Sequence, residues 1–365
     1  MKVTLLGKPQ VIMSNPFSKY RYFGWPTVAR LKNGKIAVVA SGYRFHHLCP
    51  FGKTVISYSE NEGETYTVPA PVFDTVLDDR DGGIVPFGES GVLVTSFNNT
   101  VAQQKEWALN ETIVKSEEER TFRLSYLNQI TKEEETAALG SSFRISRDNG
   151  VTFGPPIKIP VTNPHGPAVL PDGSFLWVGN VFGNGELPLA VYRIQADGTA
   201  EKRGEIEPIV YQEAPRKSFE PHAFVLEDGT ILVHFRVEEA MFTVYQTQST
   251  DGGYTWSKPR KLLHDFGGSP PHIFRHSSGV LISTYGFRGV EWKAPFGVRA
   301  MFSRDNGVTW DVDHDLYLTD ISPDLGYPST IELKDGSLLT VFYGAETPDG
   351  PPVIWQQKWR IEECI

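Results

Sequence analysis

Six segments of the chain repeat one arrangement of apolar and polar positions. Each begins with one or two special residues, often beside a proline, continues with alternating apolar positions, passes through a glycine turn, and ends in an apolar run. The segments begin at Trp25, Asp81, His165, Glu220, Pro270 and Tyr327, and their turn glycines are Gly34, Gly91, Gly173, Gly229, Gly279 and Gly336. Alternation with a period of two is typical of half-buried strands. A tight turn between two such runs predicts an antiparallel hairpin.

The turn glycines are spaced by 57, 82, 56, 50 and 57 residues. Repeats of this length, each forming a small antiparallel sheet, are typical of a β-propeller. We therefore predict an all-β fold, a single six-bladed β-propeller domain over residues 1–365. The spacing of 82 indicates an insertion in the second blade. Residues 103–137 are rich in charge, lack glycine and proline, and are expected to include a helix. The strand within residues 2–13 is expected to complete the last blade and close the ring.

A second repeat, Ser-x-Asp/Asn-x-Gly-x-Thr-aromatic, occurs four times. Its copies begin at Ser59, Ser146, Ser249 and Ser303. In such a turn the carboxylate and hydroxyl accept hydrogen bonds from backbone N–H groups, glycine supplies a positive φ, and the aromatic ring packs between sheets. Because a catalytic group or a calcium ligand is not expected in every blade, we interpret these carboxylates as structural.

Composition narrows the function classes. The formal charge is −9, from 35 Lys and Arg against 44 Asp and Glu, and a nucleic-acid binder would need a basic face. No apolar run is long enough to cross a membrane. The N-terminal apolar run is too short for a signal peptide, so we expect a cytoplasmic protein, or a secreted or periplasmic one if a leader was removed. We interpret Cys49 and Cys364 as free thiols, although one bridge between them stays possible.

The four copies of the second repeat, a motif known as the Asp box, are spread over six blade-like repeats. In this the chain resembles the sialidase superfamily over almost its whole length. The resemblance implies an active site on the propeller axis, where the innermost strands begin or end. Tyr327 matches the nucleophilic tyrosine of that family, Glu220 its glutamate partner, and Arg236 one arginine of its carboxylate-binding triad. A phenol with a pKa near about 10 needs such a base, and a neutral nucleophile avoids repulsion by an anionic sugar.

The chain departs from the family at three places. The first arginine of the triad is missing, because Gly24 and Trp25 precede Pro26. The stretch where the family has its acid/base aspartate contains no carboxylate here, and His46 or His47 is the candidate donor. The third arginine is not at its expected place, and Arg288, at the end of the fifth hairpin, is its candidate replacement.

Other residues at the starts of the inner strands are candidates for sugar binding. They are His165, His222, His272, Arg80, Asp81 and Trp25. Trp25 would offer a stacking surface to a sugar ring, and Asp81 is a further candidate acid. The three histidines would bind hydroxyl groups, with packing between blades and a three-histidine metal site as alternatives. No metal or other cofactor is expected.

The leading hypothesis is therefore a sialidase-like exo-glycoside hydrolase that acts on a terminal, acidic or modified sugar of a glycan. One alternative is a propeller polysaccharide lyase that uses histidine and tyrosine on a uronate. The other is a propeller that binds carbohydrate without turnover.

Overall fold

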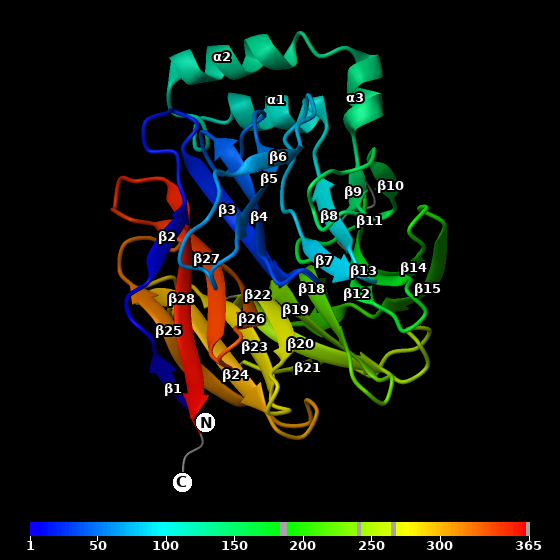
Figure 1. Cartoon of the computed structure of the whole chain (residues 1–365). Helices are drawn as coiled ribbons and strands as arrows, with labels where there is room; N and C mark the ends of the chain where they lie inside the picture. Colours follow the sequence, from blue (N-terminus) through cyan, green and yellow to red (C-terminus); the bar gives the residue numbers. More distant parts are fainter. Residues whose placement is uncertain (183–187, 239–241, 264–267, 363–365) are drawn as a thin grey trace.

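Six antiparallel sheets form a closed ring (Figure 1) in the structure, which is a computed structural model that describes residues 1–182, 188–238, 242–263 and 268–362. The inner strands of successive sheets contact one another, and the inner strand of the sixth sheet contacts that of the first. The predicted six-bladed β-propeller is confirmed.

Blades one to three follow each other along the chain. From the inner strand outwards, blade one consists of β3 (Tyr22–Arg30), β4 (Ile36–Arg44), β5 (Lys53–Ser59) and β6 (Ala70–Phe73). Blade two consists of β7 (Ile84–Phe87), β8 (Gly91–Phe97), β9 (Ser141–Ser146) and β10 (Ile157–Ile159). Blade three has a split inner strand, β11 (Val161–Thr162) and β12 (Ala168–Val169), followed by β13 (Phe175–Val181), β14 (Leu189–Ile194) and β15 (Ala200–Ile206).

Blades four to six complete the ring after a short hairpin of β16 (Ile209–Tyr211) and β17 (Ala214–Arg216). Blade four consists of β18 (Ser218–Val225), β19 (Ile231–Glu238), β20 (Phe242–Ser249) and β21 (Arg260–Lys261). Blade five consists of β22 (Gly268–Arg275), β23 (Leu281–Phe287), β24 (Phe296–Ser303) and β25 (Asp311–Thr319). Blade six consists of β26 (Gly326–Glu332), β27 (Leu338–Ala345), β28 (Pro352–Glu362) and β1 (Lys2–Leu5), and β2 (Gln10–Met13) also pairs with β28.

The two ends of the chain meet in blade six. β1 pairs antiparallel with β28, with Lys2 opposite Glu362 and Leu5 opposite Trp359, and Figure 1 shows the two strands side by side near the termini. The first strand therefore closes the ring as expected, which leaves no unpaired edge at this junction.

Glycines with positive φ form the hairpin turns of the inner strands. The predicted glycines have φ between +78° and +88° in blades one, three, four, five and six. In blade two the prediction is wrong by three residues: Gly88 has φ +53°, whereas Gly91 is the first residue of β8. Two glycines lie in this segment, and the shorter β7 places the turn at the earlier one.

The Asp boxes are structural turns, as predicted. In the third box Gly253 N–H donates to the Ser249 hydroxyl at 2.9 Å, and Thr255 N–H and hydroxyl donate to Asp251 at 3.0 and 2.6 Å. In the other three boxes the glycine N–H likewise donates to the serine hydroxyl, and the threonine N–H donates to the side-chain oxygen of the aspartate or asparagine. These hydrogen bonds lower the pKa of Asp148 and of Asp305 to about 2. Trp310, the aromatic residue of the fourth Asp box, donates a hydrogen bond from its ring nitrogen to Gln246 of blade four at 2.8 Å.

Three helices fill the insertion between β8 and β9. They are α1 (Val101–Leu109), α2 (Glu117–Leu127) and α3 (Lys132–Ala138), capped by Thr100, Ser116 and Thr131. Figure 1 shows them above one face of the propeller. Arg123 of α2 donates to the carbonyl of Leu48 at 2.6 Å, and the hydroxyl of Tyr126 donates to the carbonyl of Val76 at 2.9 Å. The insertion thus covers loops of blade one on the face where the inner strands begin.

Apolar side chains from neighbouring blades pack into shared cores. One such cluster joins blades six and one, and another joins blades three and four. Cys49 is a buried free thiol, and Cys364 lies outside the described residues. None of the described helices is long and apolar enough to span a bilayer.

Candidate functional site

Bulges at the starts of the inner strands position the candidate residues. The pairing register shifts between Gly24 and Thr27, between Phe219 and His222, between Ser269 and His272, and between Gly326 and Ser329. Each shift skips two residues, the second of which is proline, which lacks the N–H that a regular ladder would use.

The first bulge residue has an unusual backbone in several blades. Trp25, Glu220 and Tyr327 have φ of 53°, 51° and 50°, and Asp81 at the same place in blade two has φ 52°. This left-handed conformation is costly for a residue with a side chain and is concentrated at functional sites. Because Trp25, Glu220 and Tyr327 lie in the first half of an inner strand and Asp81 three residues before one, these positions point to a site on the axis.

Tyr327 and Glu220 form the centre of this site. The Tyr327 hydroxyl donates a hydrogen bond to Oε1 of Glu220, and Nε of Arg236 lies 3.2 Å from Oε2 of the same carboxylate. Burial first, and then the charge of Glu220, raise the pKa of Tyr327 well above its usual 10. The tyrosine is therefore neutral at physiological pH, and the carboxylate that would accept its proton is already in place.

Arg288 adds a second guanidinium to the same place. Its Nε is fully enclosed and has no hydrogen-bond partner, and its guanidinium carbon lies 5.6 Å from the ring centre of Phe242. Burial lowers its pKa, but the nearby Tyr343, Tyr327, Asp324 and Glu220 together outweigh burial and raise it. Within the described part of the chain this cation makes no hydrogen bond or ion pair.

Asp81 and Arg80 lie beside the tyrosine. Asp81 is close enough for its charge to raise the pKa of Tyr327 further. Arg80 Nε lies 3.6 Å from Oδ1 of Asp81, and both side chains are buried. The structure thus brings Tyr327, Glu220, Arg236, Arg288 and Asp81 together at one end of the axis.

The predicted stacking role of Trp25 is wrong. Its side chain is 1% exposed. The guanidinium carbons of Arg44 and Arg80 lie 5.0 and 4.5 Å from its ring centre, and the ring of Tyr343 lies 5.8 Å away. A ring enclosed in this way has no free face for a sugar. Trp25 instead fills the space beside the tyrosine and supports two arginines.

Arg44 and Asp78 form a buried ion pair behind Trp25 that sequence reasoning missed. Both side chains are fully buried. Arg44 Nη2 also donates to Oδ2 of Asp78 and to the carbonyl of His47, each at 2.8 Å. Arg80 lies 3.8 Å from the same carboxylate. One carboxylate therefore serves two arginines on the axis.

Asp324 was also missed, although it lies only three residues before Tyr327. Its carboxylate accepts hydrogen bonds from the hydroxyls of Tyr22 and Tyr343 at 3.0 and 2.9 Å, and His47 Nδ1 lies 3.3 Å away. Burial raises its pKa, and these contacts, led by the hydrogen bond from His47, bring the net shift below the usual value. Polar residues just before an inner strand were the available sequence signal.

The two candidate histidines of the first blade differ in position. The ring centre of His47 lies 4.8 Å from that of Trp25, and Trp25 in turn lies beside Tyr327. His47 therefore lies at the edge of the residues around Tyr327, with Trp25 between it and the tyrosine. His46 instead faces α2, where its Nε2 lies 2.9 Å from Glu119. Only His47 belongs to the neighbourhood of the site.

His165, His222 and His272 gather on the axis below the tyrosine. Their ring centres are 5.5, 5.4 and 4.3 Å apart. His222 Nδ1 accepts from the N–H of Ile273 at 2.9 Å, and His272 Nδ1 accepts from the N–H of Thr330 at 3.4 Å, so these two histidines each bond to the next blade. His165 Nδ1 lies 3.3 Å from the hydroxyl of Thr27 in blade one.

Burial keeps these histidines neutral. It lowers the pKa of His222 to about 4 and that of His165 and His272 well below 6.5. His165 and His272 are also buried, at 2% and 8% exposure, and both lie within the stack of rings between the blades. Packing between blades, the alternative to sugar binding, therefore describes these two, and among the described residues no group of histidine, cysteine or carboxylate ligands could hold a metal ion.

Comparisons with known proteins agree with this architecture. A family described as BNR repeat-like domain matches residues 88–340, more than half of the chain. A protein of unknown function from Dyadobacter fermentans is 19% identical, with a TM-score of 0.76 over 99% of each chain. The NanB sialidase from Streptococcus pneumoniae is 13% identical, with a TM-score of 0.66 over 97% of this chain and 71% of that one.

The sialidase of Trypanosoma rangeli, solved in complex with sialic acid, is 15% identical, with a TM-score of 0.60 over 98% of this chain and 58% of that one. No curated protein sequence matches significantly. At these identities the solved structures establish the fold, and the match over residues 88–340 establishes the family. The chain belongs to the BNR repeat-like domain family, and it shares the six-bladed β-propeller fold of these sialidase structures.

Proposed function

We propose that the protein is an exo-acting glycoside hydrolase that removes a terminal acidic sugar from a glycan, with Tyr327 as its nucleophile. The observation that carries the proposal is the hydrogen bond from the Tyr327 hydroxyl to Glu220, beside the guanidinium groups of Arg236 and Arg288. The sialidases with the same fold support the reaction class.

The chemistry divides into two displacements at the anomeric carbon. In the first, Glu220 accepts the hydroxyl proton while the Tyr327 oxygen bonds to that carbon and the bond to the leaving oxygen breaks. We assign Asp81 as the acid that protonates the leaving oxygen, because it lies beside Tyr327 whereas Trp25 separates His47 from it. In the second, Asp81 takes a proton from water, the water oxygen bonds to the carbon, and Glu220 returns its proton to the departing tyrosine oxygen.

A tyrosine suits an anionic substrate. A carboxylate nucleophile would repel a negatively charged sugar, whereas a neutral phenol does not, and sialidases are the recognised exception to the scheme with two carboxylates. The raised pKa of Tyr327 keeps the phenol neutral until Glu220 accepts its proton in the reaction.

Arg288 is the main argument for an acidic sugar. A buried guanidinium without a partner costs free energy unless a ligand supplies the negative charge. Arg236 already lies beside Glu220, so Arg288 is the group available to a sugar carboxylate. Because only Arg236 of the sialidase triad has a counterpart at its expected place in this sequence, the substrate class extends beyond sialosides to uronides and other acidic sugars.

The test is a panel of 4-methylumbelliferyl glycosides of sialic, other ulosonic and uronic acids, with neutral glycosides for comparison. We expect turnover of at least one acidic member and a loss of about 10³-fold or more in kcat for Tyr327→Phe and Glu220→Gln. Turnover that survives both substitutions would refute the mechanism.

Two variants serve as matched controls. Tyr285 is also a buried tyrosine whose hydroxyl donates to a carboxylate, that of Asp313, and Glu62 also pairs with an arginine, Arg30. Tyr285→Phe and Glu62→Gln should keep full turnover. An unsaturated product that absorbs in the near ultraviolet would favour the lyase. Binding of acidic sugars without turnover, unchanged in Tyr327→Phe, would favour the binding protein.

A further inference from the structure

A groove leads away from the axial site towards the helical insertion. Its inner part is a cavity of about 450 Å³ that reaches Tyr22, His47 and Asp324. Its outer part is a cavity of about 660 Å³ against α2. Arg21, Phe45 and His46 line both cavities, so the two cavities adjoin at these side chains. We call the two together the insertion groove.

The inner end of the insertion groove lies next to the proposed catalytic residues. Asp324 is near enough to Arg288 to raise its pKa. The buried ring of Trp25 lies between Tyr22 and Tyr327, 5.7 and 6.3 Å from their ring centres, and separates that side of the groove from the tyrosine. A chain attached to a sugar at Tyr327 would therefore enter the groove past Arg288, at Asp324.

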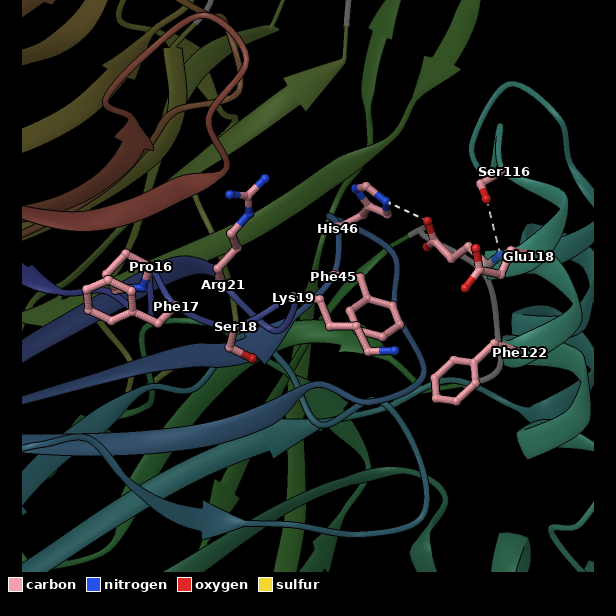
Figure 2. Close-up of a pocket in the computed structure, with 11 residues that line it drawn as sticks. Pro16, Phe17, Ser18, Lys19, Arg21, Phe45, His46, Ser116, Glu118 and Phe122 are labelled. Atoms are coloured by element: carbon pink, nitrogen blue, oxygen red, sulfur yellow. Dashed lines mark hydrogen bonds and ion pairs between the residues drawn. The ribbon is translucent and has the colours of Figure 1, made fainter.

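The outer part of the insertion groove has the chemistry of a sugar site. Figure 2 shows Phe45 and Phe122 on either side of the Lys19 side chain, with Arg21 and His46 towards the other end. The Phe45 and Phe122 ring centres are 5.9 Å apart, and Lys19 Nζ lies 4.5 Å above the Phe122 ring. Ligand sites of roughly 300–1,000 Å³ combine such aromatic surfaces with a few polar groups.

Arg21 supplies hydrogen-bond donors at the junction of the two cavities. It is exposed and, within the described part of the chain, makes no hydrogen bond or ion pair. A guanidinium offers five N–H donors, which suits the hydroxyl groups of a sugar.

The charges of the insertion groove differ from those around Tyr327. Lys19 and Arg21 are its two permanent cations, and its carboxylates are Glu118, Glu119, Asp324 and Asp349. A groove with more carboxylates than cations disfavours an anionic chain. The occupant is therefore a neutral, hydroxyl-rich chain, in contrast to the acidic sugar proposed for Arg288.

We propose that the insertion groove binds the leaving part of the substrate, a neutral oligosaccharide, with its sugars against Phe45 and Phe122 and its hydroxyl groups on Arg21. This inference rests on the proposed hydrolase. It gives the insertion in blade two a role: α2 supplies the outer wall that extends recognition beyond the terminal sugar.

The test compares two substrates that share the terminal acidic sugar turned over by the enzyme, one on 4-methylumbelliferone and one on a neutral trisaccharide. For Phe122→Ala we expect the ratio of kcat/KM, trisaccharide over aryl glycoside, to fall about tenfold. For Arg21→Ala we expect a fall of about fivefold. The exposed positions Tyr254 and Arg360 serve as matched controls, and Tyr254→Ala and Arg360→Ala should leave the ratio unchanged. An unchanged ratio in both groove variants would overturn the inference.

A binding measurement separates this inference from the proposed activity. Saturation-transfer NMR on the intact protein, with neutral trisaccharides of β-linked glucose, galactose or N-acetylglucosamine, needs no turnover. Contact that is present in the wild type and lost in Phe122→Ala supports the groove even if no glycoside is hydrolysed. No Phe122-dependent contact with any of the trisaccharides would overturn it.

Discussion

Removing the charge of Asp78 is expected to destabilise the whole propeller. The Asp78 and Arg44 side chains are both fully buried, and Arg44 packs on the ring of Trp25. In Asp78→Asn the shape is kept, but the Arg44 cation loses its balancing charge in a place that water does not reach.

The structure sets the size of the effect. Breaking a buried ion pair by removing one partner costs about 3–5 kcal/mol, whereas an exposed pair contributes about 0–1 kcal/mol. Arg44→Met should cost less than Asp78→Asn, because Asp78 keeps Arg80 at 3.8 Å. The double variant should be more stable than Asp78→Asn alone, since no unbalanced cation remains.

The assay is equilibrium unfolding in urea followed by tryptophan fluorescence. Asp74→Asn is the matched control, because Asp74 pairs with Lys53 at the surface. We expect the midpoint of Asp78→Asn to fall well below that of Asp74→Asn. Equal midpoints for the two variants would refute the reasoning that Asp78 balances a buried cation.

Three further predictions concern stability. A Cβ at Gly52 would lie 2.0 Å from Nη1 of Arg44 and 2.2 Å from Oδ1 of Asp78, so Gly52→Ala should lower the urea midpoint about as much as Asp78→Asn. Burial raises the pKa of Asp79 to about 7. The contribution of this carboxyl to the free energy of unfolding, on the order of 4 kcal/mol, is therefore lost as pH rises from about 4 through 7. The free energy of unfolding of Asp79→Asn should therefore rise relative to that of the wild type between pH 5 and 8. A difference between the two proteins that stays constant over this range would contradict the prediction. Burial lowers the pKa of His222 to about 4, so its contribution is present above about 6.5 and is lost as pH falls towards 4, about 3 kcal/mol. In urea titrations at pH 7 and pH 4, the gap between wild type and His222→Gln should change in favour of the variant at acid pH.

Local patterns predicted the fold well because they act over short stretches of chain. Alternating apolar positions, glycine turns and Asp boxes each specify a hairpin from fewer than about twenty neighbouring residues. The same patterns placed Tyr327 and Glu220 at the starts of inner strands, and the bulges beside Pro328 and Pro221 bring both to the axis.

The rest of the site depends on contacts between distant parts of the chain. Arg44 and Asp78 meet across blade one, and Tyr22 meets Asp324 across the closure of the ring. No local pattern shows such pairs. Trp25 was misjudged for the same reason, since the arginines that cover it come from the ends of other strands and loops.

The most direct test of the account is to trap the covalent intermediate on Tyr327. A fluorinated glycosyl fluoride of the acidic sugar that the protein turns over should form a slowly hydrolysed adduct, measured by intact mass and located by peptide mapping. The account predicts one sugar bound to Tyr327, with adduct formation strongly slowed in Glu220→Gln. An adduct on any other residue, or turnover with no adduct on Tyr327, would contradict it.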